Sequence, residues 1–147
     1  MKLHAIFLAD AAMQNADGTF MVWRGGITEV TSSVIPAPAN FTLVVRIEMD
    51  RQEAEDLHEF QLRIEHQGKE IVPWSKNPLA AKIPPSEPRG YLNLHADLRF
   101  IIPEAGDGFI ESMIDESIRL PLLYFRVRHV PGLILGSGPP TGGPPLS

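Results

Sequence analysis

His95 and Asp97 are the two residues whose types and spacing come nearest to acid–base chemistry. They lie two positions apart in an alternating segment, so both project from the same face of a predicted β-strand. A carboxylate beside an imidazole can orient the ring and stabilise its charged form, as in catalytic His–Asp dyads. The same pattern is typical of a solvated strand face that carries cross-strand ion pairs. A hydrolase or a metal-dependent enzyme with a site near His95 and Asp97 is therefore kept as an alternative.

The rest of the sequence gives little support for catalysis. The five histidines lie in separate segments without a His-x-His or His-x₃-His pair, and the chain has no cysteine. Metal-ligand spacings and a thiol nucleophile are thus missing from the sequence. It also lacks a Gly-x-Ser-x-Gly elbow, a phosphate loop and a dinucleotide-binding motif. We predict a protein that is not an enzyme, with no catalytic, cofactor-binding or metal-binding residues.

The elements that would position such residues are strands. Residues 43–49 and 92–100 alternate apolar and polar side chains with a period of two, which is typical of strands with one face on a core and one in water. The same pattern predicts three sets of inward-facing side chains. These are Leu43, Val45, Ile47 and Met49; Leu123, Phe125 and Val127; and, in residues 109–115, one of two alternating sets, with Ile110, Ser112 and Ile114 favoured over Phe109, Glu111, Met113 and Asp115.

Eight or nine such strands, separated by turn signals, predict an all-β fold. The expected architecture is a single antiparallel β-sandwich, immunoglobulin-like or C2-like, with a closed β-barrel as the alternative. We place the sandwich at residues 1–130. Residues 131–147 contain five prolines and five glycines, a composition that predicts a flexible tail because it cannot bury enough apolar surface to offset the entropy of ordering.

Composition limits the partners. The formal net charge of −5 argues against nucleic-acid binding, which requires a basic surface. The apolar stretch Ala5–Ala9 is too short for the core of a signal peptide, and no apolar run approaches the length that spans a bilayer. We therefore expect a cytoplasmic protein that binds neither nucleic acid nor membrane.

Two regions of the chain resemble a known family. The first holds Leu-Ala-Asp-Ala-Ala (8–12), Asp17-Gly18, Arg24-Gly25-Gly26 and Pro36-Ala37. The second holds Ile102-Pro103-Glu104-Ala105-Gly106 and Leu120-Pro121-Leu122, followed by Phe125-Arg126-Val127. Over residues 2–130 the chain is similar to an uncharacterised family of small bacterial all-β proteins, a domain of unknown function. The resemblance implies a β-sandwich and carries no activity.

The residues that remain point to binding. Leu133, Ile134 and Leu135 form an apolar triplet just after the last strand, which could dock on a partner or add a strand to a neighbouring sheet. Trp23 and Trp74 could belong to an interaction surface, or to a small-ligand or carbohydrate-binding platform. Our main interpretation is a non-catalytic module that binds a protein partner or assembles with itself.

Overall fold

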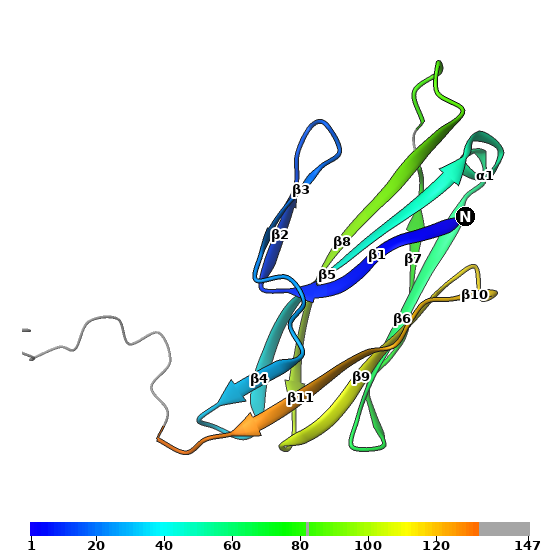
Figure 1. Cartoon of the computed structure of the whole chain (residues 1–147). Helices are drawn as coiled ribbons and strands as arrows, with labels where there is room; N and C mark the ends of the chain where they lie inside the picture. The colour runs from blue at the N-terminus through cyan, green and yellow to red at the C-terminus, as the bar shows by residue number, and fades with distance from the viewer. Residues whose placement is uncertain (82, 133–147) are drawn as a thin grey trace, which may run out of the picture.

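The computed structural model describes residues 1–81 and 83–132, and this part of the chain is almost entirely β. Eleven strands and one short helix follow one another along the chain (Figure 1). They are β1 Lys2–Ala9, β2 Ala11–Gln14, β3 Phe20–Trp23, β4 Glu29–Ser32, β5 Ala37–Asp50, α1 Arg51–Glu55, β6 His58–His66, β7 Lys69–Leu79, β8 Arg89–Ile102, β9 Gly106–Ile114, β10 Ile118–Arg119 and β11 Leu123–His129. Because α1 has five residues, no helix in the described residues is long and apolar enough to cross a membrane.

Most strands form two sheets that pack face to face. One has the order β1-β5-β8, and the other has the order β4-β11-β9-β6-β7 with β10 beside β9. Neither sheet closes on itself, so the sandwich prediction is confirmed and the closed barrel is wrong. One pair departs from the antiparallel expectation, because β4 runs parallel to β11 with Val30 opposite Val127.

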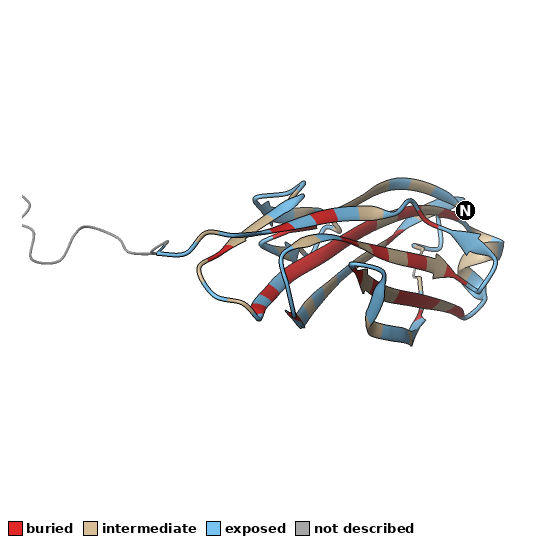
Figure 2. Cartoon of the chain, turned by 90° about the horizontal axis from the view of Figure 1, so that it is seen from below, coloured by how far each residue is buried: buried red, intermediate tan, exposed pale blue. Residues whose placement is uncertain are grey.

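The core lies between the two sheets, where buried residues follow the strands of both layers (Figure 2). The predicted inward sets on β5, β9 and β11 are confirmed, with Leu123 the one member that is only partly buried. β5 is also buried on its other face, since Thr42 and Val44 have exposed fractions of 3% and 1%. This second covering comes from β2, which lies against β5 and β8, so it does not follow from the period of β5.

The hairpin at the start of the chain differs from expectation. Residues 3–9 and 19–23 are apolar segments on either side of Asp17-Gly18, a turn signal, and this pattern predicts a hairpin between them. In the structure β3 pairs with β2 instead, with Met13 opposite Met21, and β1 pairs with β5. Figure 1 shows β2 and β3 as a separate two-stranded ribbon that follows the end of β1. The reversal at Asp10, where the chain leaves β1 for β2, was not predicted.

Prolines mark the places where strands have only one neighbour. β7 is an edge strand and contains Pro73 and Pro78, as expected of a residue that cannot donate to a ladder. The four prolines of residues 75–90 predict an irregular connection there. Because β7 continues to Leu79, that prediction is wrong at its start. β5 likewise begins before the predicted strand and includes Pro38, at a position where β1 has not yet begun to pair with it.

Helix α1 has a capping box at its N-terminus. The Asp50 side chain accepts a hydrogen bond from the Glu53 N–H at 2.8 Å, and the Glu53 carboxylate accepts one from the Asp50 N–H at 2.9 Å. This capping box satisfies two backbone donors that a short helix would leave free. The charged residues 50–56 predict at most two helical turns, and α1 confirms this.

Candidate interaction surface

His95 and Asp97 do not form a hydrogen-bonded pair in the structure. Asp97 accepts a hydrogen bond from the Thr42 hydroxyl at 2.8 Å, and the His95 ring meets the Phe20 ring edge-on with centroids 6.2 Å apart. Both side chains project from the outer face of β8, as the alternation predicted, and each contacts a different neighbour. His95 packs against the hairpin, and Asp97 hydrogen-bonds the neighbouring strand β5.

A histidine–aspartate pair does exist, between residues far apart in the sequence. His58 Nδ1 lies 2.7 Å from Asp115 Oδ2, and His58 Nε2 lies 2.6 Å from the Glu53 carbonyl oxygen. Both ring nitrogens therefore face acceptors, so both must donate and the ring carries a proton on each. The second carboxylate oxygen of Asp115 accepts the Glu59 N–H at 2.8 Å.

The environment of this pair supports the charged form of both groups. Burial alone would lower the pKa of His58, but its hydrogen bonds to Asp115 and to the Glu53 carbonyl raise that pKa above its ordinary value. Burial would raise the pKa of Asp115, yet the hydrogen bonds from His58 and the Glu59 N–H lower it. With 6% of its side chain exposed and no free nitrogen, His58 has nothing to offer a substrate. It ties α1, β6 and the turn after β9 together.

The sequence does not predict the pair of His58 and Asp115, because nothing in the spacing of these two residues reveals it.

In the described residues no three histidine, aspartate or glutamate side chains lie close enough together to hold a metal ion. The other histidines bind elsewhere: His4 to Glu48, His66 to the Gly106 carbonyl and His129 to the Ser33 carbonyl.

The two tryptophans lie on different parts of the sandwich. Trp23 is on the β2–β3 hairpin, and Trp74 is on β7 at the edge of the six-stranded sheet. Trp74 receives the Arg63 guanidinium, 5.6 Å from its ring centroid, a favourable cation–π distance. The two rings therefore do not share a single sugar-binding platform. The proposed interaction residues Leu133, Ile134 and Leu135 lie outside the described residues.

The outer face of the six-stranded sheet is covered by paired charges. Arg63 contacts Glu65 and Glu111, and Lys76 contacts Glu59 and Glu116. Exposed ion pairs of this kind keep a sheet face solvated and contribute little to stability. Arg63 also lies over the Trp74 and Phe109 rings, and Phe109 meets Tyr124 edge-on, so aromatic side chains stand among these ion pairs.

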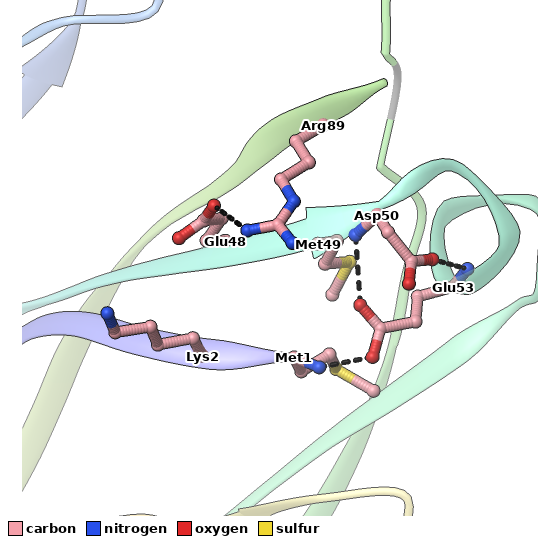
Figure 3. Close-up of a pocket in the computed structure, with 7 residues that line it drawn as sticks. All are labelled: Met1, Lys2, Glu48, Met49, Asp50, Glu53 and Arg89. Atoms are coloured by element: carbon pink, nitrogen blue, oxygen red, sulfur yellow. Dashed lines mark hydrogen bonds and ion pairs between the residues drawn. The ribbon is translucent and has the colours of Figure 1, made fainter.

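A small depression beside the start of β1 and the end of β5 is also lined by paired charges. It has a volume of about 210 Å³, below the roughly 300–1,000 Å³ of typical ligand pockets. Figure 3 shows its charged groups in contact: Arg89 with Glu48, and the Met1 amino group with Glu53. Hydrogen bonds from His4 and Arg89 lower the pKa of Glu48, and those from the Met1 amino group and the Asp50 N–H lower the pKa of Glu53. These carboxylates already have partners.

The β2–β3 hairpin carries the clearest exposed apolar surface. Its register places Ala11 opposite Trp23 and Met13 opposite Met21, so these four side chains share one face of the hairpin. The opposite face turns toward the sandwich, because Phe20 contacts His95 and Val22 lies beside Phe7 at Gly25. Met13, Met21 and Trp23 are 49%, 46% and 48% exposed. We call Ala11, Met13, Met21 and Trp23 the hairpin patch.

Local contacts hold this hairpin in place. In its turn Asp17 accepts hydrogen bonds from the Thr19 hydroxyl at 2.6 Å and the Thr19 N–H at 3.0 Å, and these bonds lower the pKa of Asp17. Gly18 has a φ of +83°, a conformation that glycine adopts at no steric cost. The Asn93 side chain donates to the Gly18 carbonyl at 3.0 Å, which fastens the tip of the hairpin to β8. The hairpin patch is therefore presented on an anchored element.

Fold and surface together define a class of protein, a β-sandwich with an exposed apolar hairpin. The outer face of its six-stranded sheet carries ion pairs, and the β2–β3 hairpin lies against the three-stranded sheet. The chain belongs to a family of unknown function, DUF6941, whose family model matches residues 4–124. The resemblance to an uncharacterised family is confirmed. A comparison with curated proteins finds no match.

Proposed function

We propose that this protein is a non-catalytic interaction module of the bacterial cytoplasm that binds another protein through the hairpin patch. The observation that carries the proposal is the outward face of β2 and β3, where two methionines and a tryptophan lie side by side in water. Contiguous exposed apolar side chains mark interaction sites in soluble proteins. Scattered apolar residues such as Leu57, on the segment before β6, do not.

The chemistry of the patch indicates the kind of partner. Tryptophan and methionine are enriched in protein interfaces, and the flexible thioether of methionine adapts to differently shaped apolar surfaces. Beside the patch, Arg24 and Asp10 form an ion pair at 3.3 Å, and the Asp10 N–H donates to the Trp23 carbonyl. An apolar centre with a charged rim fits an apolar protein segment flanked by polar residues.

Three observations favour binding over the alternatives. The buried His58–Asp115 pair has both ring nitrogens occupied, and His95 and Asp97 contact different partners. Trp23 and Trp74 lie on separate elements, which does not favour a sugar platform.

Replacing Met13 with lysine and Met21 with glutamate in one variant is expected to weaken partner binding. These residues are directly opposite on neighbouring strands, so the new charges can pair across the hairpin and preserve it while removing the apolar surface. Loss of central apolar contacts raises the Kd about tenfold or more, since 1.4 kcal/mol is a factor of ten. The measurement is affinity capture with the full-length protein, followed by calorimetry with the purified captured protein.

The matched control replaces Leu57 with lysine and Tyr124 with glutamate. These side chains are 84% and 65% exposed and lie away from the hairpin, and the net charge changes equally in both variants. The proposal requires that the control retains binding and that both variants melt near the wild-type temperature. Equal affinity of the wild type and the hairpin variant would exclude the hairpin patch as the binding surface.

A further inference from the structure

The four edge strands of the two main sheets differ in how they discourage pairing with another chain. Exposed edges present free backbone donors and acceptors, and proteins protect them with short strands, prolines and bulges. β4 has four residues. β7 contains two prolines and two shifts of register against β6, and β1 has a register shift between Leu3 and Ala5.

β8 has none of these features. It has fourteen residues without a proline, and it pairs with β5 over all fourteen positions without a shift. On its other side no strand of residues 1–81 or 83–132 pairs with it. In an antiparallel ladder every second residue directs its N–H and C=O away from the neighbouring strand. β8 therefore presents a long, regular row of backbone groups at the edge of the three-stranded sheet.

We infer that β8 pairs with β8 of a second copy of this chain, antiparallel, about a two-fold axis at Ala96. A two-fold axis perpendicular to the sheet places residues on either side of Ala96 opposite each other and keeps the same face outward. This register joins residues 90–102 of one copy to residues 102–90 of the other. It makes one continuous six-stranded sheet from the β1-β5-β8 sheets of two copies.

The side chains of β8 are complementary to themselves in this register. On the outer face His95 lies opposite Asp97 of the other copy, and Tyr91 lies opposite Ile101. On the inner face Leu94, which is half-buried in the single chain, lies opposite Leu98. Tyr91 and Ile101 are 42% and 59% exposed in the single chain, and pairing would cover them against each other.

Neighbouring registers are less favourable. Moving the axis to Asp97 places two Asp97 carboxylates opposite each other, and directly opposed like charges destabilise a strand pair. Moving it to His95 places the two imidazole rings opposite each other and separates each from Asp97 of the other copy. Moving it to Leu98 shortens the paired segment by about four residues, because β8 ends at Ile102. The axis at Ala96 joins residues 90–102 of the two copies and places His95 of each copy opposite Asp97 of the other.

The absence of cysteine from the chain allows a direct test of the register by disulfide trapping. Directly opposite residues have Cα atoms about 4.5–5.5 Å apart, within the 4.4–6.8 Å that a disulfide spans. Under mild oxidation the full-length Ala96→Cys variant is expected to form a covalent dimer. Tyr91→Cys and Ile101→Cys are expected to cross-link when mixed but not alone, because each lies about 33 Å from its own copy at 3.3 Å per residue.

The control is Tyr124→Cys, an exposed residue on the six-stranded sheet. Sedimentation of the wild-type chain should give a mass that rises with concentration toward twice the 16.3 kDa of one chain. A monomer at every concentration would overturn the inference. So would a dimer in which Ala96→Cys cross-links no faster than Tyr124→Cys, since the interface would then lie elsewhere. This test does not depend on the hairpin patch, so it can succeed or fail separately from the proposed function.

Discussion

Replacing His58 with alanine is expected to lower the free energy of unfolding by about 2–3 kcal/mol at pH 6. The change removes two hydrogen bonds from a charged, buried ring and leaves Oδ2 of Asp115 and the Glu53 carbonyl without their donor, while Oδ1 of Asp115 keeps the Glu59 N–H. Because Asp115 is 34% exposed, water compensates part of the loss, and the effect stays below that of breaking a fully buried ion pair. Urea unfolding of both proteins measures the difference.

The difference in the free energy of unfolding between wild type and His58→Ala should depend on pH, because it comes from a pair of charged groups. The pKa of His58 is raised in the folded protein, so its stabilisation is complete below the ordinary value of about 6.5 and is lost as the pH rises through the folded pKa. The pKa of Asp115 is lowered, so its share is present above about 3.9 and is lost as the pH falls through the folded pKa. The difference between wild type and variant should therefore be largest from about pH 4 to 6.5.

An exposed histidine provides the control. His129 is exposed and hydrogen-bonds the Ser33 carbonyl, so His129→Ala should change stability by no more than about 0.5 kcal/mol. If the stability difference for His58→Ala were the same at pH 5.5 and pH 9, the ring would not be a cation in the folded protein.

Replacing Gly108 with alanine is expected to cost about 2–3 kcal/mol through overpacking. A Cβ atom there would lie 2.6 Å from Cζ of Phe125 and 2.7 Å from the Glu65 carbonyl oxygen. Neither can move easily, because the Phe125 ring is buried and stacked on His66, and the Glu65 carbonyl belongs to the backbone of neighbouring β6. The loss can be measured as a lower urea midpoint with an unchanged slope.

A second substitution distinguishes the clash with the Phe125 ring from the clash with the Glu65 carbonyl oxygen. In a Gly108→Ala and Phe125→Leu double variant the smaller side chain removes the clash with the ring, so the two costs should sum to more than the double variant shows. Asp107→Ala, at the neighbouring exposed position, should have little effect. Additive costs would show that the ring does not resist the new methyl group.

The sequence predicted the sandwich because strand alternation records which face is buried. The inward sets on β5, β9 and β11 follow from their own periodicity. The covering of Thr42 and Val44 does not, because it depends on where the β2–β3 hairpin packs. The parallel pairing of β4 with β11 is likewise set by tertiary structure and leaves no local signal.

The interaction surface was predicted only in part. Trp23 was named as a candidate, but its neighbours Met13 and Met21 were not, because the four-residue strand β2 is too short to show a period. The hairpin register, rather than composition, brings the two methionines together. His58 and Asp115 were missed for a similar reason, since only the pairing of β6 with β9 brings them within reach.

The position of the hairpin on the outer side of the three-stranded sheet has a consequence for a two-fold dimer through β8. Both copies of the hairpin would then lie on the same broad surface, because the axis keeps the outer faces of the two sheets together. A target with two binding segments could engage both at once, and the second attachment would be intramolecular. Avidity of this kind can exceed single-site affinity by about 10²–10⁴-fold without any new contact. Weak apolar recognition at one hairpin would then suffice for durable binding to a repetitive or dimeric target.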